Sequence, residues 1–140
     1  MGDLFNTPLT KEEERIIRGW IEDLRSGEYE KGRGALRKSD EGGSKFCCLG
    51  VLCDRHAKEI GGVWRSTSLI GIKMYLGHIA TLPEEISRWA GLNLLPRVTY
   101  ENRWVELDEL NDNEGLTFAQ IADMIESELE RALAKPTWDR

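Results

Sequence analysis

Histidine, cysteine and proline are scarce in this chain of 140 residues, which contains two, three and four of them respectively. The cysteines all lie in the short segment FCCLGVLC, and an odd, clustered set does not match a disulfide framework. No apolar run approaches the roughly 18 residues needed to cross a bilayer, and the first residues lack the basic and apolar regions of a signal peptide. We therefore expect a cytosolic protein without a membrane partner.

Charged residues are plentiful but unevenly distributed. The net charge is −6. Residues 31–46 contain five basic and two acidic residues, whereas residues 101–130 contain ten acidic residues and one basic residue, Arg103. Overall acidity argues against general nucleic-acid binding, for which a positive surface usually dominates. The basic segment could nevertheless contact a single phosphate group.

The spacing of apolar residues predicts three main helices. The first covers about residues 11–25 and begins at a capping box. The second covers about residues 46–60 and is apolar nearly all round its first half, so we expect it to be central. The third begins after Thr117, which forms a second capping box with Gln120, and ends before Pro136.

The remaining segments predict the rest of an α+β fold. The glycine-rich stretch at about 27–45 is expected to be a long loop with at most one short strand near 35–37. Further expected elements are strand-like material at 63–79, a short helix at 83–91 and a hairpin at 97–107 that turns at Asn102. We predict a single domain, residues 1–140, in which a small antiparallel sheet packs against three main helices, followed by a short tail from residue 135.

The three cysteines allow three interpretations. On a helix, which turns about 100° per residue, Cys47, Cys48 and Cys53 point in three directions, so they cannot share a metal ion. Cys47 or Cys48 could be a nucleophile at a helix N-terminus, but the only available bases are His56 and His78. Packing as small hydrophobic residues is the favoured interpretation. We assign no catalytic residue, no metal ligand and no cofactor.

The carboxylates that precede the last helix suggest calcium, but their spacing excludes an EF-hand. With Gly115 at the sixth position of such a loop, Leu110 and Ile121 would occupy the first and twelfth positions, where ligands are required. Residues 111–113 are better explained as an Asx-type turn.

The glycine-rich stretch before the second helix is the favoured binding segment. Basic side chains beside the free amides of a helix N-terminus can hold an anion. The segment matches no P-loop or dinucleotide motif, so a solvated surface loop is the alternative. Trp64 and Trp104 are the tryptophans best suited to stack on a ligand. The candidate ligand-binding residues are Tyr29, Gly32, Arg33, Gly34, Arg37, Lys45, Phe46, Trp64 and Trp104.

Four segments in the same order resemble a group of small bacteriophage and prophage proteins that have no assigned activity. They are WIEDLRSGEYEKGRGALR, FCCLGVLCD, LPEEISRWAGL and LNDNEGLTFAQIADMIE, and the resemblance runs from residue 20 to residue 126. It implies a viral accessory protein that works in the cytoplasm of its bacterial host. It carries over no catalytic residue.

These observations favour a non-catalytic counter-defence protein that binds a small anionic, nucleotide-like ligand. The alternative is a protein–protein inhibitor that uses its acidic C-terminal third to occupy a basic surface of a host factor. A cysteine-dependent enzyme is the third possibility. The sequence alone does not identify the ligand, the host target or the oligomeric state.

Overall fold

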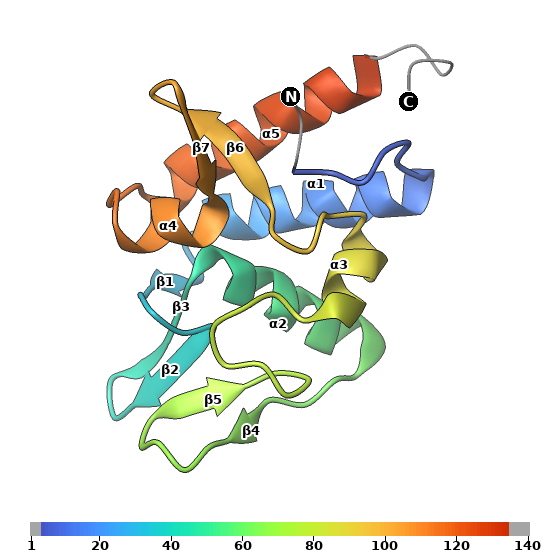
Figure 1. Cartoon of the computed structure of the whole chain (residues 1–140). Helices are drawn as coiled ribbons and strands as arrows, with labels where there is room; N and C mark the ends of the chain where they lie inside the picture. Colours follow the sequence, from blue (N-terminus) through green and yellow to red (C-terminus); the bar gives the residue numbers. More distant parts are fainter. Residues whose placement is uncertain (1–3, 135–140) are drawn as a thin grey trace.

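A computed structural model of the chain describes residues 4–134 and confirms the α+β class (Figure 1). Five helices and seven strands lie in this range, and none of the helices is long and apolar enough to span a membrane. In chain order the elements are α1 (Lys11–Arg25), β1 (Glu30–Lys31), β2 (Arg37–Asp40), β3 (Gly43–Phe46), α2 (Cys48–Ile60), β4 (Arg65–Ser66), β5 (Ile72–Met74), α3 (Glu84–Ala90), β6 (Arg97–Tyr100), β7 (Arg103–Glu106), α4 (Leu107–Asp112) and α5 (Phe118–Ala134).

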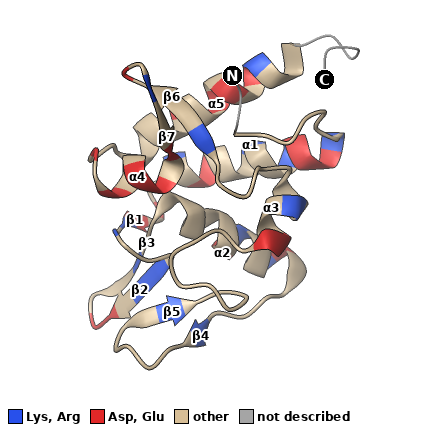
Figure 2. Cartoon of the chain, viewed as in Figure 1, with Lys and Arg blue, Asp and Glu red and all other residues tan. Residues whose placement is uncertain are grey.

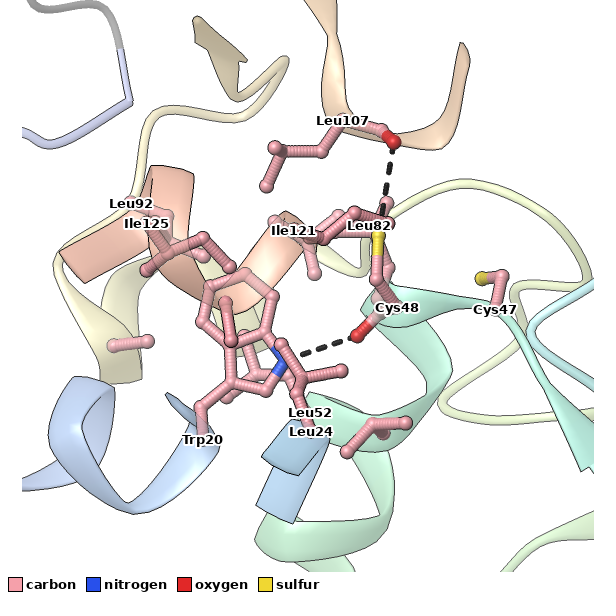
Figure 3. Close-up of a cluster of buried hydrophobic side chains, with 14 of the residues drawn as sticks. Trp20, Leu24, Cys47, Cys48, Leu52, Leu82, Leu92, Leu107, Ile121 and Ile125 are labelled. Carbon is pink, nitrogen blue, oxygen red and sulfur yellow. Dashed lines mark hydrogen bonds between the residues drawn. The ribbon is translucent and has the colours of Figure 1, made fainter. Parts of the chain in front are cut away.

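The three long helices form the centre of the molecule. Helix α1 packs against α5 on one side and against α2 on the other, and its apolar stripe is fully buried. The indole Nε1 of Trp20 donates a hydrogen bond to the carbonyl oxygen of Cys48 at 2.9 Å, which ties α1 to the start of α2 (Figure 3). Both predicted capping boxes are present, the second one with hydrogen bonds between Thr117 and Gln120.

The main sheet has five short strands in the order β1-β3-β2-β5-β4. Strands β1 and β3 run parallel and the other neighbouring strands run antiparallel. The sheet is therefore mixed, whereas the sequence predicted an antiparallel sheet. Strands β6 and β7 form the predicted hairpin, and its turn residues Glu101 and Asn102 have φ values of 51° and 63°. This left-handed conformation suits the tight turn of a two-residue hairpin.

One sequence prediction about the sheet was wrong. Residues 27–45 do not form a long loop, because they contain β1, β2 and most of β3. Residues 63–79, predicted to be strand-like, contain the short strands β4 and β5. Strands of two to four residues leave little room for alternation, and β2 and β3 carry few apolar residues on either face, so the usual strand signal is missing.

Helix α2 lies directly against the beginning of β2. A Cβ atom at Gly50 would collide with the carbonyl group of Leu36, so only glycine permits this close approach. The backbone N–H of Cys47 donates a hydrogen bond to the same Leu36 carbonyl at 3.3 Å. The sheet is thereby fixed to the N-terminal end of the central helix.

Candidate anion-binding site

The register of the sheet gathers cations and hydroxyl groups on one of its faces. Arg37 pairs with Phe46 on β3 and with Lys73 on β5, while Ser39 pairs with Ser44. Paired residues point to the same side of a sheet and successive residues alternate, so these side chains share a face. Ser66 of β4 joins them, because it pairs with Lys73. We define the cationic face as Arg37, Ser39, Ser44, Ser66 and Lys73.

Hydrogen bonds position the side chains of the cationic face. Arg37 Nε donates to Ser44 Oγ at 3.1 Å, and the hydroxyl oxygens of Ser39 and Ser44 are 2.8 Å apart. Lys73 Nζ donates to Ser66 Oγ at 3.1 Å. Neither cation forms an ion pair with any residue between 4 and 134, and no strand residue on this face is acidic. The remaining N–H groups of Arg37 and Lys73 are therefore available to an anion.

Aromatic rings support Arg37 from beneath. Its guanidinium carbon lies 5.2 Å from the ring centroid of Phe46 and 5.4 Å from that of Trp64, both within cation–π range. Phe46 also makes an edge contact with Tyr29, at 5.0 Å between ring centroids, and Trp64 packs against Tyr75 at the same distance. We call Tyr29, Phe46, Trp64 and Tyr75 the aromatic wall.

Asp54 of α2 holds two members of the aromatic wall in place. Its carboxylate accepts hydrogen bonds from the Tyr29 hydroxyl at 2.6 Å and from Trp64 Nε1 at 3.0 Å. Burial, reinforced by this carboxylate, raises the pKa of Tyr29 to about 12. Lys58 Nζ lies 3.3 Å from Asp54 and balances its charge. Asp54 was not predicted as a site residue, because nothing in the sequence around it indicates contact with Tyr29, 25 positions earlier, or with Trp64, ten positions later.

Lys45 belongs to the opposite side of the sheet. It pairs with Lys38 and Glu30, and its ammonium group lies 3.6 Å from the Glu30 carboxylate. A shallow cavity of about 480 Å³ beside it is lined by three carboxylates against this one amine. The cavity therefore suits an anion poorly, although its lining includes a residue that the sequence assigned to the site.

Asn111 of α4 occupies the start of α2. Its Oδ1 atom accepts a hydrogen bond from the backbone N–H of Cys48 at 3.2 Å, and its Nδ2 donates to the Gly32 carbonyl oxygen at 2.8 Å. The neighbouring carboxylate of Asp112 accepts a hydrogen bond from the Gly34 backbone N–H at 3.1 Å. Residues 111 and 112 are the last two residues of α4, whereas the sequence predicted an Asx-type turn at 111–113. The N-terminus of α2 is capped from within the molecule, and Gly32 and Gly34 anchor the glycine-rich segment to α4.

The three cysteines lie in the hydrophobic core, as predicted, and have no disulfide bonds. Cys48 Sγ lies 3.7 Å from the Leu107 carbonyl oxygen (Figure 3). Burial raises the pKa of Cys47 to about 11 and the pKa values of Cys48 and Cys53 well above the ordinary range. Such thiols remain protonated near neutral pH, which argues against a cysteine nucleophile. The described residues contain no cluster of potential metal ligands.

The structure thus brings together four of the residues predicted for the site: Tyr29, Arg37, Phe46 and Trp64. Arg33 is exposed on the loop before β2 and forms no ion pair with the described residues. Trp104 is on the outer face of the β6–β7 hairpin, where it stacks on Arg97 and is far in the fold from β5 (Figure 1). Ser39, Ser44, Ser66 and Lys73 complete the face but were not predicted.

Comparison with known families identifies the chain. Residues 12–129 match a domain of unknown function, DUF8296, and the chain belongs to that family. No curated protein and no solved structure matches the chain.

Proposed function

We propose that this member of the DUF8296 family is a non-catalytic binding protein for a small anionic ligand that carries a phosphate group. The observation that supports the proposal most strongly is the direct pairing of Arg37 with Lys73 on a face without carboxylates. Three serine hydroxyls surround the two cations. A planar guanidinium, an ammonium group and neutral hydroxyl donors together match the oxygen atoms of a phosphate.

The aromatic wall favours a nucleotide-like ligand over inorganic phosphate. Trp64 and Tyr29 are only partly buried, so their exposed edges border the cationic face. A base beside Trp64 would gain stacking energy while its phosphate contacts Arg37. Asp54 keeps Trp64 in this orientation without ligand, which lowers the entropy lost on binding.

The biological setting that we propose follows from the resemblance to bacteriophage and prophage proteins. The protein would act in the cytoplasm of a bacterial host as an accessory, counter-defence factor. Sequestration of a nucleotide-derived signal requires tight binding and no catalytic step.

A thermal-shift screen with linear and cyclic nucleotides tests the proposal. A ligand at 100 times its Kd stabilises the folded state by about 2.7 kcal/mol through mass action. We expect at least one nucleotide to raise Tm, and inorganic phosphate to have a smaller effect. Lys73→Ala should remove the gain. The proposal fails if no nucleotide raises Tm.

Lys38 offers a matched control. Lys38 is an exposed residue of β2. Like Lys73, it has no ion pair among the described residues, but its side chain points to the face of the sheet opposite the cationic face. Lys38→Ala should keep the full ligand-induced gain in Tm. Equal losses for Lys38→Ala and Lys73→Ala would indicate general charge attraction and would contradict a defined site.

A further inference from the structure

A second surface, at the β6–β7 hairpin, exposes large apolar side chains. Leu94, Leu95 and Trp104 are 51%, 50% and 55% exposed. The leucines immediately precede β6, and Trp104 is on β7. Arg97, the first residue of β6, contacts Trp104: its guanidinium carbon lies 4.7 Å from the Trp104 ring centroid. The β6–β7 hairpin lies at the opposite end of the molecule from β4 and β5 (Figure 1).

A small cavity opens beside the two leucines. Its volume of about 20 Å³ is enough for one group the size of a water molecule or a methyl group. Its walls are largely apolar, and two carboxylates complete the lining. The lining includes Leu82, Leu94, Leu95, Leu107, Glu106 and Asp108.

Two carboxylates, those of Glu106 and Asp108, make this surface acidic. Burial, followed by the charge of Glu106, raises the pKa of Asp108. Asp108 forms no ion pair within residues 4–134, and Glu106 has only a 4.0 Å contact with Arg97. Acidic residues continue along α4, which is coloured red in Figure 2 beside the hairpin. A cation placed here would relieve repulsion between neighbouring carboxylates.

We propose that this apolar–acidic surface, formed by Leu94, Leu95, Trp104, Glu106 and Asp108, docks a basic segment of another protein. The terminal methyl group of one aliphatic side chain of the segment would enter the cavity, and flanking Lys or Arg residues would pair with Glu106 and Asp108. Trp104 would cover the segment from the hairpin side. Exposed aromatic residues of this kind often dominate the binding energy of an interface. The inference does not rest on the anion-binding function, which uses the main sheet.

Selection from a random peptide display library tests this docking surface with defined probes. We expect enrichment of peptides that combine Lys or Arg with a single aliphatic anchor. Synthetic copies of the enriched peptides should bind the full chain in calorimetry, and their affinity should fall as salt rises. Trp104→Ala and Leu95→Ala should each weaken binding at least about tenfold. No enrichment, or enrichment of acidic peptides, would overturn the proposal.

Ile70→Ala is the matched control, since Ile70 is fully exposed at the distant β4–β5 turn. This variant should bind the selected peptides as the unmodified chain does. Circular dichroism and Tm should show that all three variants are folded. Equal binding by Trp104→Ala and Ile70→Ala would contradict the proposal. Analytical sedimentation provides a second test. If the unmodified chain is a dimer that Trp104→Ala dissociates, the docking surface binds a second copy of the chain, and the proposal is contradicted.

Discussion

The cations of the main sheet and the arginines of helices α1 and α5 have different neighbours. Arg15, Arg18 and Arg25 of α1 and Arg131 of α5 each contact at least one carboxylate within 3.5 Å. The sheet and its loops, in contrast, carry six cations that have no ion pair with residues 4–134. These six are Lys31, Arg33, Arg37, Lys38, Arg65 and Lys73. Figure 2 shows the contrast as blue strands below mixed red and blue helices.

Helix geometry explains part of this difference. Residues three or four positions apart are neighbours on a helix, and α1 contains Glu12 and Glu14 at these distances from Arg15 and Arg18. Exposed pairs of this kind stabilise a protein by only about 0–1 kcal/mol. Their main consequence is that the helical surface offers no concentrated positive charge. The sheet offers one, although the chain as a whole has a net charge of −6.

The largest predicted effect comes from breaking the contacts that join α4 to the start of α2 and to the segment between β1 and β2. Asn111 is fully buried, and its amide satisfies both the N–H of Cys48 and the carbonyl of Gly32. Asn111→Ala leaves both groups without partners, so we expect a loss of about 2–4 kcal/mol in unfolding free energy, measured by urea denaturation. The exposed neighbour provides the control: Asn113→Ala should change stability by less than about 1 kcal/mol. Similar values for the two variants would show that the Asn111 contacts contribute little.

An intermediate effect separates a paired cation from an unpaired one. Arg55 is largely buried and contacts Asp23 at 2.7 Å and Glu59 at 2.6 Å. Arg55→Gln should lower the unfolding free energy by about 1–3 kcal/mol, because it leaves the partly buried Asp23 without its ion-pair partner and Glu59 with Arg15 alone. Lys73→Gln should change it by less than about 0.5 kcal/mol, since Lys73 has no carboxylate to lose. Equal destabilisation by the two substitutions, measured in the same denaturant series, would contradict the distinction.

The smallest effect is a dependence on pH. His56 is buried, its Nδ1 lies 2.7 Å from the Tyr75 hydroxyl, and burial lowers its pKa from the ordinary value of 6.5. Below about pH 6.5 the unfolded chain therefore binds a proton that the folded chain does not, so stability falls as pH decreases through that range. Comparison of Tm at pH 7.5 and pH 5.5 measures the loss, and His56→Gln should reduce it. An unchanged loss in His56→Gln would assign the effect to other groups.

Sequence reasoning predicted the long helices better than the sheet. The helices have uninterrupted apolar stripes and capping residues, which are local signals. The segments RKSD and GSKF of β2 and β3 have no such apolar pattern, and their pairing depends on the turn at 41–42 and on contacts with β5. If the turn at 41–42 is recognised, residues 37–40 become a strand. Arg37 and Ser39 then point to one face of the sheet, and Lys38 and Asp40 point to the other.

The site was predictable only in part for the same reason. The basic composition and the nearby aromatics identified Arg37, Phe46 and Trp64. Lys45 was assigned to the same site because it is a basic residue just before the second helix, but it is on the opposite face of the sheet from Arg37. Lys73 lies 36 positions after Arg37, and only the β2–β5 register brings the two together. A contact of this kind leaves no signal in a single sequence.

An NMR titration with the nucleotide that gives the largest thermal shift tests the central claim most directly. Two-dimensional ¹H–¹⁵N spectra report on each backbone amide of the full chain. We predict saturable shifts at Arg37, Ser39, Ser44, Ser66 and Lys73, together with the indole signal of Trp64, and loss of these shifts in Lys73→Ala but not in Lys38→Ala. Shifts confined to the cavity beside Lys45, or to the N-terminus of α2, would contradict the claim that the cationic face is the binding site.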